Sequence, residues 1–294
     1  MSSLPARESS AVLSEQRTEQ PAVALISNKS ASPQYAAYLR LQKRKLWLIR
    51  LSRIAVFVLF LAIWELAAAM QWVNPMLTSR PSSMVTAFQE LAFEGELFRH
   101  TWITGLETII GIVVSMVLGT LIAVLFWWST FASRVLEPYV VVLNALPKVA
   151  LGPIFYIWLG DRYSVYGMAV AISIIVTIIM IESGFKEISK TKLKLMESFG
   201  ATRSQMLTMV LLPASVPNFI ATLKVNVGLT LVGVIMGEFL SSKAGLGYLI
   251  TYGGQVFQMN MVMVSIAMLA LLSIVLYSLV DLLGRYALKK NHYE

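Results

Sequence analysis

Long apolar runs, rather than alternating or amphipathic segments, dominate the chain from about residue 49 onwards. A bilayer core of about 30 Å needs roughly 20 apolar residues in an α-helix. Six runs meet this length: 49–70, 101–128, 136–159, 165–185, 216–240 and 261–283. Each run is too long for a barrel strand and lacks the alternation of one. The pattern therefore predicts an all-α, polytopic integral membrane protein with about six transmembrane helices.

The composition agrees with this class and excludes several chemistries. The 294 residues are 57% hydrophobic and only 14% charged, whereas soluble domains carry roughly 25% charged residues. The chain has no cysteine, which excludes disulfides, thiolate nucleophiles and cysteine-ligated metals. Its two histidines, His100 and His292, lie far apart in sequence, and histidine metal sites need clustered ligands. No metal site is predicted.

The N-terminal segment differs from the rest of the chain. Residues 1–45 are rich in Ser, Ala, Gln, Glu and Pro, a composition that cannot bury enough apolar surface to offset the entropy of ordering. We expect a disordered cytoplasmic tail over 1–45 and a transmembrane domain over 46–290. The first long apolar run begins about fifty residues in, without an obvious cleavage site, so no signal peptide is predicted.

The basic residues predict the orientation in the membrane. With the N-terminus in the cytoplasm, eighteen of the 24 Lys and Arg residues fall on the cytoplasmic side and four on the opposite side. The remaining two, Lys148 and Lys224, lie inside apolar runs. This bias predicts two cytoplasmic termini. The net charge of +8 then reflects topology and contact with anionic lipid rather than a nucleic-acid partner.

Proline and glycine mark two further features. Pro81, followed by Ser82 and Ser83 as an N-cap, predicts an amphipathic helix in the external segment 71–100. We interpret it as a structural linker, with a docking surface as the alternative. In the run 136–159, the stretch NALPKVALGP predicts a kink. Because broken helices face protein or a water-filled cavity, the kink makes Asn144, Pro147 and Lys148 candidates for a translocation pathway.

Residues 186–213 form a polar, glycine-broken segment between two apolar runs on the predicted cytoplasmic side. Ser189 and Thr191 can cap a helix, and Gly200 can end it in the left-handed conformation. Leu195 and Phe199 lie one turn apart on that helix. An exposed apolar pair at a bend is more often a protein-docking surface than a catalytic site.

A second short helix should follow directly. Thr202 and Gln205 have the spacing of a capping box, and we expect Pro213 to end this helix before the next span. The segment 186–213 is thus predicted to be a helix, a sharp turn and a second helix.

The segment also resembles a known family. Gly200, nine residues, Val210, one residue and Leu212-Pro213 match the pattern of the EAA loop, which is found in the membrane subunits of bacterial binding-protein-dependent ABC importers. WELAA (64–68), SRPSSMV (79–85), GATRSQ (200–205), LPASVP (212–217) and GEFLSSKAGLGYLI (237–250) are similar to the nitrate/sulfonate/taurine (and bicarbonate) permeases. The likeness covers about residues 50–290. Lys194, Leu195 and Met196 stand where the family has Glu-Ala-Ala.

The resemblance implies a type I ABC importer permease fold with a cytoplasmic coupling helix that sits in a groove of an ATP-binding subunit. It implies a bacterial inner-membrane location, two ATPase subunits that hold ATP and Mg²⁺, a periplasmic or lipid-anchored binding protein, and no cofactor on this chain. The chain has no P-loop motif. The implied coupling residues are Lys194, Leu195, Met196, Glu197, Ser198, Phe199, Gly200, Ala201, Thr202 and Pro213. Ser241, Ser242, Gly245 and Gly247 would lie at the external mouth.

Charged residues inside spans are costly and need a reason. Lys224, with Asn226 and Glu238 in the same run, could line a path for an anion. Alternatively, Lys224 reaches the cytoplasmic interface or pairs with an acid. Glu182 and Lys186 have the spacing of an ion pair, and the glycines at 228, 233 and 237 have the spacing of close helix packing.

These features favour the permease subunit of an ABC importer for a small anion such as a sulfonate, taurine or nitrate. Six spans are too few to surround a path, so we expect a second permease copy. A neutral or cationic vitamin precursor is an alternative substrate. An ion-coupled secondary transporter would need acid pairs and twin broken helices, and an intramembrane enzyme would need catalytic residues at depth. The sequence shows neither.

Overall fold

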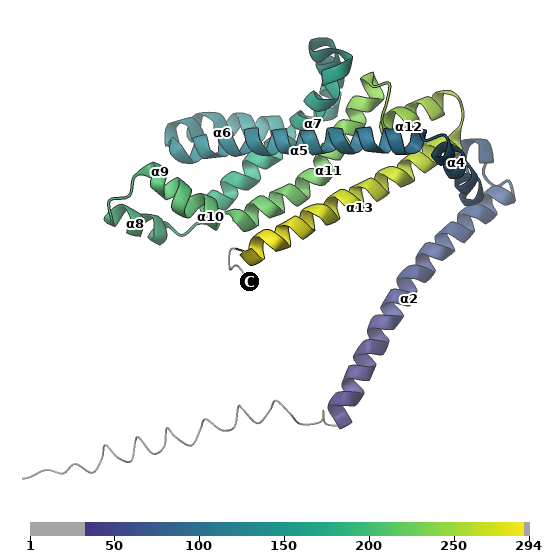
Figure 1. Ribbon diagram of the computed structural model, residues 1–294, viewed down its shortest axis with the longest axis horizontal. Helices are drawn as coiled ribbons and strands as arrows, with labels where there is room; N and C mark the ends of the chain where they lie inside the picture. The colour runs from purple at the N-terminus through teal and green to yellow at the C-terminus, as the bar shows by residue number, and fades with distance from the viewer. Residues whose placement is uncertain (1–32, 291–294) are drawn as a thin grey trace, which may run out of the picture. The chain divides into compact units, whose positions relative to one another are not determined.

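The structure, a computed structural model, describes residues 33–290 and is helical throughout its regular elements (Figure 1). It contains no strand within these residues, which confirms the all-α class. In chain order the helices are α2 (Pro33–Ala69), α3 (Pro75–Thr78), α4 (Pro81–Phe93), α5 (Glu96–Trp128), α6 (Thr130–Ala145), the 3-10 helix η2 (Lys148–Leu151), α7 (Gly152–Glu187), α8 (Lys190–Ser198), α9 (Arg203–Met206), the π-helix η3 (Leu207–Leu211), α10 (Leu212–Ala214), α11 (Val216–Ser241), α12 (Leu246–Gln255) and α13 (Met259–Lys290).

The chain divides into two compact units, residues 1–63 and 64–294. The described part of the first unit is α2 as far as Ile63. This helix begins at Pro33, so residues 33–45 are helical rather than part of a disordered tail. Residues 1–32 of the expected tail lie outside the described residues.

Five helical segments over residues 33–290 are long and apolar enough to cross a membrane: Leu41–Ala69, Glu96–Trp128, Lys148–Glu187, Val216–Ser241 and Met259–Lys289. The sixth predicted span, 136–159, is wrong as a single helix. Its residues are divided among α6, η2 and the first turns of α7.

The break follows from the prolines that predicted a kink. Leu146 has an extended backbone (φ −66°, ψ 138°), the conformation that a following proline imposes. The chain re-enters a helix through the 3-10 turn η2, with Pro153 in the first turn of α7. A further break occurs at Gly160, where φ is +71°. The predicted kink is therefore confirmed, and it is strong enough to end one helix and begin another.

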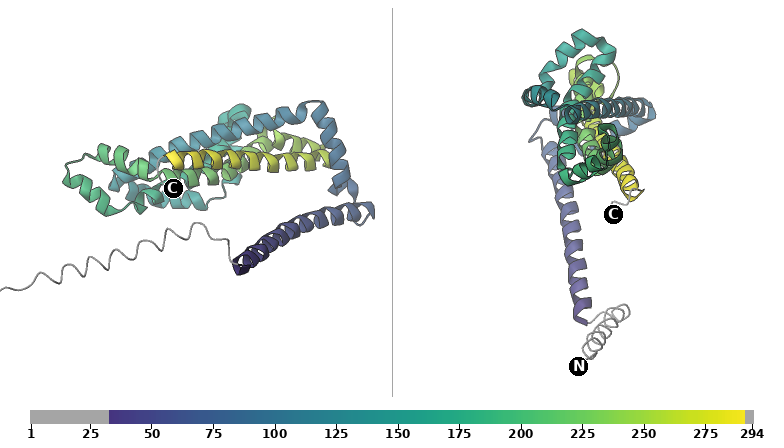
Figure 2. Two further views of the ribbon diagram at one scale, coloured as in Figure 1. Left: turned by 60° about the horizontal axis from the view of Figure 1, so that its bottom comes forward. Right: turned by 90° about the vertical axis from the view of Figure 1, so that its left-hand side faces the viewer.

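The second unit is a bundle organised around α11, which packs against α5, α7 and α13. One apolar core gathers Leu97, Leu231, Leu246 and Leu249 beneath α12, with Leu91 of α4 at its edge. A second core joins Ala123, Ile181, Phe185 and Leu211, close to α8–α10. Figures 1 and 2 show α8 and α9 at one end of this bundle and α4 and α12 towards the other.

Close contact between α7 and α11 depends on glycine. A Cβ atom at Gly233 would lie 2.6 Å from the Cα of Ala169, and one at Gly237 would lie 2.5 Å from the Cα of Val165. Small residues that let two backbones approach are typical of membrane helix interfaces. The predicted packing role is confirmed for these two glycines. It is wrong for Gly228, where a Cβ would meet nothing within 4 Å.

The helix predicted within the segment 71–100 forms as α4, but its cap differs. The N-cap is Arg80, without a side-chain hydrogen bond, and Pro81 occupies the first turn, where its missing N–H costs nothing. Ser82 lies inside the helix and donates to Glu65 from its N–H (3.0 Å) and hydroxyl (2.8 Å). With Leu91 buried, α4 is attached at both ends, which supports the linker interpretation.

A pair of alanine substitutions on α11 tests the glycine contact. Gly233→Ala should lower the free energy of unfolding by about 1–3 kcal/mol, the usual cost of overpacking, because its methyl group meets the α7 backbone. Gly228→Ala should be neutral or stabilising, since alanine favours a helix over glycine. Unfolding of the purified chain in mixed micelles measures both, and equal stabilities would contradict the contact.

Candidate coupling loop and external turn

The turn between α8 and α9 has the geometry of a Schellman motif. Gly200 adopts φ +77°, and its N–H donates to the carbonyl of Glu197 at 2.9 Å. The N–H of Ala201 donates to the carbonyl of Met196 at 3.0 Å. These two bonds satisfy carbonyls that the end of a helix leaves without partners. The predicted left-handed glycine is confirmed. At the other end, Ser189 is the N-cap but makes no side-chain hydrogen bond.

The second helix begins with the predicted capping box. The N–H of Gln205 donates to the Thr202 hydroxyl oxygen (3.3 Å), and the N–H of Thr202 donates to Oε1 of Gln205 (2.8 Å). Pro213, however, does not end the helical path. The backbone widens into η3 just before it, and Pro213 lies in the short α10 that leads to α11. The π-turn accommodates the proline, so the prediction of a stop is wrong.

The loop is anchored while its apolar side chains stay outside. Nη1 of Arg203 donates to the carbonyl of Trp128, the last residue of α5, at 2.7 Å. Leu195 is 56% exposed and Phe199 78% exposed, while Met196 is partly buried. Leu195 and Phe199 are therefore exposed at the bend, as the sequence predicted. Arg203 is an anchor that no local pattern indicated, because its partner lies 75 residues away.

The predicted external-mouth glycines belong to a buried turn that starts α12. Gly245 has φ +108°, and its N–H donates to Nδ1 of His100 at 2.8 Å. The N–H of Leu246 donates to the hydroxyl of Thr104, also at 2.8 Å. The first N–H groups of a helix have no partner within that helix, and here α5 supplies their acceptors. His100 therefore has a structural role.

Glu238 completes this turn from α11. The carboxylate is 1% exposed, and it accepts the N–H of Gly247 (2.5 Å) and the hydroxyl of Thr104 (2.7 Å). A Cβ at Gly247 would lie 2.7 Å from Oε2 of Glu238, and one at Gly245 would collide with the same carboxylate. Only glycine fits at both positions. We call Glu238, His100, Thr104 and residues 245–247 the α12 turn cluster.

Two other mouth candidates contact α7 or their own loop. The hydroxyls of Ser241 and Ser164 lie 2.5 Å apart, which fastens the end of α11 to α7. Ser242 hydrogen-bonds Ala244. Since Gly245 and Gly247 are buried, the structure brings the mouth candidates together as a packed turn. The sequence alone did not indicate that Glu238 would join them.

The intramembrane candidates lie at separate places. Nζ of Lys224 is 2.6 Å from Oδ1 of Asp281, whose other oxygen binds Arg285 at 2.8 Å, so the alternative of pairing with an acid is correct. Asn226 is fully buried and donates to the Thr177 hydroxyl at 2.8 Å. These two residues hold helices together and do not share a lining with Glu238.

The broken helix is different because its polar groups stay accessible. Asn144 and Pro147 are exposed. Nζ of Lys148 donates to the carbonyl of Asn144 at 3.2 Å, which leaves its charge without an acidic partner among the ion pairs found over residues 33–290. The three kink residues are therefore the pathway candidates that the geometry favours. The predicted pair of Glu182 and Lys186 is also present, at 2.8 Å.

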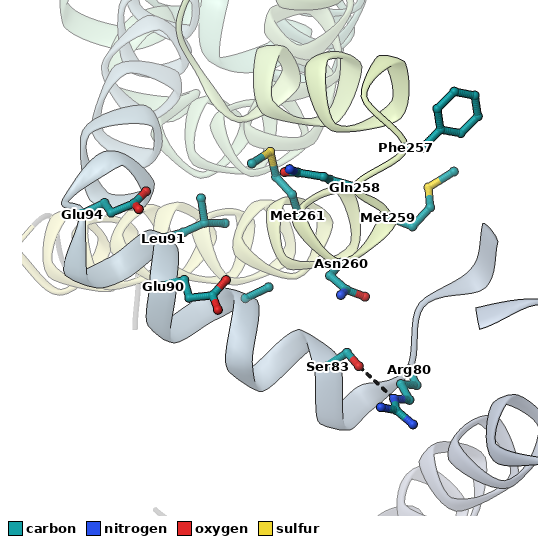
Figure 3. Close-up of a pocket in the computed structure, with 11 residues that line it drawn as sticks. Arg80, Ser83, Glu90, Leu91, Glu94, Phe257, Gln258, Met259, Asn260 and Met261 are labelled. Carbon is teal, nitrogen blue, oxygen red and sulfur yellow. Dashed lines mark hydrogen bonds between the residues drawn. The ribbon is translucent and has the colours of Figure 1, made fainter. Parts of the chain in front are cut away.

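An additional cleft of about 710 Å³ lies between α4 and residues 257–261 (Figure 3). Arg80, which donates to Ser83 at 2.8 Å, stands at one end, and Glu90 and Glu94 stand at the other. The hydroxyl of Ser79 donates to Asn260 at 2.7 Å, which ties the two walls together. None of the predicted site residues lines this cleft.

The bundle, with five helical segments long and apolar enough to cross a membrane, is that of a multi-pass membrane protein. Its fold is similar to that of the MetNI methionine ABC transporter (TM-score 0.60, 17% identity, 67% of this chain and 98% of that chain). It is also similar to a bacterial ABC transporter involved in the import of alginate (TM-score 0.54, 15% identity, 85% and 99%). The chain belongs to the family of binding-protein-dependent transport system inner membrane components, whose model matches residues 115–291.

Three individual permeases are similar to this chain in sequence. The chain is 32% identical to the formylaminopyrimidine transport permease protein ThiX of Halalkalibacterium halodurans, over 65% of this chain and 76% of that protein. It is 28% identical to the aliphatic sulfonates transport permease SsuC of Bacillus subtilis, described as putative, over 86% and 91%. It is 21% identical to the taurine permease TauC of Escherichia coli, over 81% and 90%. The resemblance inferred from the motifs is confirmed.

Replacing Glu238 tests the α12 turn cluster. Glu238→Ala should destabilise the chain by about 1–3 kcal/mol, because a buried N–H and a buried hydroxyl lose their acceptor. Glu238→Gln keeps one acceptor oxygen and should cost less. Glu90→Ala, at an exposed position of α4, is the control for loss of one carboxylate. Unfolding in mixed micelles gives the order, and a Glu238→Ala chain as stable as the control would refute the role.

Proposed function

We propose that this chain forms the translocation pathway of an ABC importer in a bacterial cytoplasmic membrane, and that α8 couples it to a separate ATP-binding subunit. The observation that carries the proposal is the exposed pair Leu195 and Phe199, held on a rigid turn next to the anchored Arg203. Large apolar side chains left exposed beside fixed backbone are typical of an interface. The remaining proposed coupling residues are Lys194, Met196, Glu197, Ser198, Gly200, Ala201, Thr202 and Pro213.

The connections of the loop explain how movement would reach the membrane. The two backbone hydrogen bonds of the Schellman turn hold α8 rigidly against α9. The hydrogen bond from Arg203 connects α9 to the end of α5. Through η3 and α10 the same segment continues into α11, the central helix of the bundle. Closure of ATPase subunits around α8 would therefore displace α5 and α11 together.

The charge on α8 gives the partner a chemical signature. Lys190, Lys192 and Lys194 are exposed within a nine-residue helix that has one acid, Glu197. Lys194 occupies the position at which the resembling family has glutamate. The groove that receives α8 is therefore expected to carry acidic side chains, because opposite charges favour docking and select the partner.

The assembly that we propose has two copies of this chain, two ATPase subunits and an external binding protein. The five candidate spans of one copy are too few to enclose a path. Residues Leu143, Val149, Ile157 and Trp158, around the break, are exposed and apolar, and a second copy would cover such a surface. ATP and Mg²⁺ would be held by the partner subunits, and no cofactor is proposed for this chain.

The proposed substrate is a small anion. Lys148 supports this choice, because its charge lies at a broken helix, while Lys224 gives less support since Asp281 neutralises it. Relatives named for aliphatic sulfonates and taurine are consistent with an anion. The relative named for formylaminopyrimidine favours a vitamin precursor as the second candidate.

Purification of the chain from its native membrane tests the docking role of Phe199. The wild-type chain should retain an ATP-binding subunit, whereas Phe199→Ala should weaken that association about thirtyfold, as expected for an interface hot spot. Phe93→Ala, which removes a 91% exposed aromatic from α4, should have no such effect. Equal recovery from both variants would contradict the proposed surface. A ligand released from a co-purified binding protein would identify the substrate.

A second test concerns coupling rather than docking. Gly200→Asp should leave membrane insertion intact but reduce ATP-driven uptake at least tenfold, because a left-handed residue with a side chain strains the turn. Gly95→Asp is the matched control: Gly95 has nearly the same conformation (φ +75°) and the same open surroundings, but joins α4 to α5. Unchanged uptake with Gly200→Asp would refute the role, and uptake insensitive to ATP depletion would favour a secondary transporter.

A further inference from the structure

The N-terminal half of α2 carries an unusual concentration of positive charge. Seven Lys and Arg residues, and no acidic residue, lie between Glu19 and Glu65. Six of them are on α2, and five of these six lie immediately before its most apolar part: Lys43, Arg44, Lys45, Arg50 and Arg53. We call these five the basic collar. All five are exposed, and none of the ion pairs found over residues 33–290 involves them.

The collar surrounds the helix instead of forming one polar face. At 100° per residue, its side chains project in directions spread around α2, interleaved with exposed apolar residues such as Leu46, Leu48 and Ile49. A cytoplasmic protein that docks on one side would leave part of this charge unused. Lipid headgroups, in contrast, surround an inserted helix on all sides.

The depth of the collar matches the headgroup layer. If the hydrocarbon begins near Ile54, the rise of about 1.5 Å per residue places Arg50 about 5 Å and Lys43 to Lys45 about 12–15 Å above Arg53. The interfacial layer is about 5–8 Å thick, and the Debye length adds about 8 Å at physiological ionic strength. Trp47, 68% exposed, lies between these two groups, and tryptophan is enriched at membrane interfaces.

One side of α2 presents a shallow surface with a cation towards each end. It is formed by Lys45, Leu48, Ile49, Ser52, Arg53 and Val56. Lys45 lies at its N-terminal end, Leu48 and Ile49 lie in the middle, and Ser52, Arg53 and Val56 lie at the other end. From Ile54 the helix continues with apolar side chains, and a phospholipid likewise has a charged headgroup followed by apolar chains. The planar guanidinium of Arg53 suits a phosphate.

We propose that the basic collar is a binding site for anionic phospholipid headgroups, with a phosphate between Lys45 and Arg53 and an acyl chain along Val56. The site recognises net negative charge, since a zwitterionic headgroup offers its phosphate together with a cation. It exceeds what orientation of the chain requires and is independent of the substrate and of the ATPase contact.

Lipid selectivity of the full chain in liposomes tests this site. Spin-labelled phosphatidylglycerol should associate with the chain about fivefold more strongly than spin-labelled phosphatidylcholine at low salt, and the preference should fall in 1 M salt. The variant Lys43→Gln/Arg44→Gln/Lys45→Gln should lose most of this preference. It keeps Arg50 and Arg53 next to the span, and proteolysis of the C-terminus from either side checks that its orientation is unchanged.

The matched control removes the same charge elsewhere. Lys190→Gln/Lys192→Gln/Lys194→Gln on α8 should retain the wild-type preference, because α8 is not an inserted helix. An equal loss in both variants would overturn the proposal, since net charge rather than the collar would then set the selectivity. A wild-type chain without preference for phosphatidylglycerol would also overturn it. The collar would then be assigned to binding an acidic surface on another protein. A preference that survives 1 M salt would refute an electrostatic site.

Discussion

The need to satisfy backbone polar groups away from water governs this structure more than any single contact. A helix that starts or ends inside a membrane exposes N–H and C=O groups that lipid cannot bind. At α12 the acceptors come from His100, Thr104 and Glu238. At the exposed end of α5 the donor for the carbonyl of Trp128 comes from Arg203. Both solutions join helices that are far apart in sequence, so capping the termini also assembles the bundle.

This constraint gives polar residues at membrane depth a structural use before a functional one. Glu238, Asn226 and Lys224 each have a partner on another helix, and each pairing gives the residue a role in holding helices together. The break after α6 leaves Lys148 accessible instead. The kink and the anchored helix–turn–helix occur in a chain that belongs to a family of transport-system inner membrane components. One end of the bundle holds the buried turn that starts α12. The other end presents the exposed side chains of Leu195 and Phe199.

Local patterns predicted local features well. Gly200 ended a helix, Thr202 and Gln205 formed a capping box, and the prolines of 144–153 broke the helix, because each depends on residues within one or two turns. Predictions that needed longer range were less successful. The prediction of one span over 136–159 was wrong because it rested on the length of the apolar run and not on the prolines inside it. Pro213 did not end the helix because the backbone widens into η3 just before it.

The sequence by itself determined the class of the protein, since hydrocarbon thickness and backbone hydrogen bonding leave helices as the only solution for runs of this length and polarity. It also determined the turn at Gly200, whose bonds are local. Only the tertiary structure decided the roles of Gly245, Gly247 and Glu238. A glycine is required where a carboxylate from another helix occupies the space of its side chain, and that proximity arises from packing between helices rather than from any spacing along the chain.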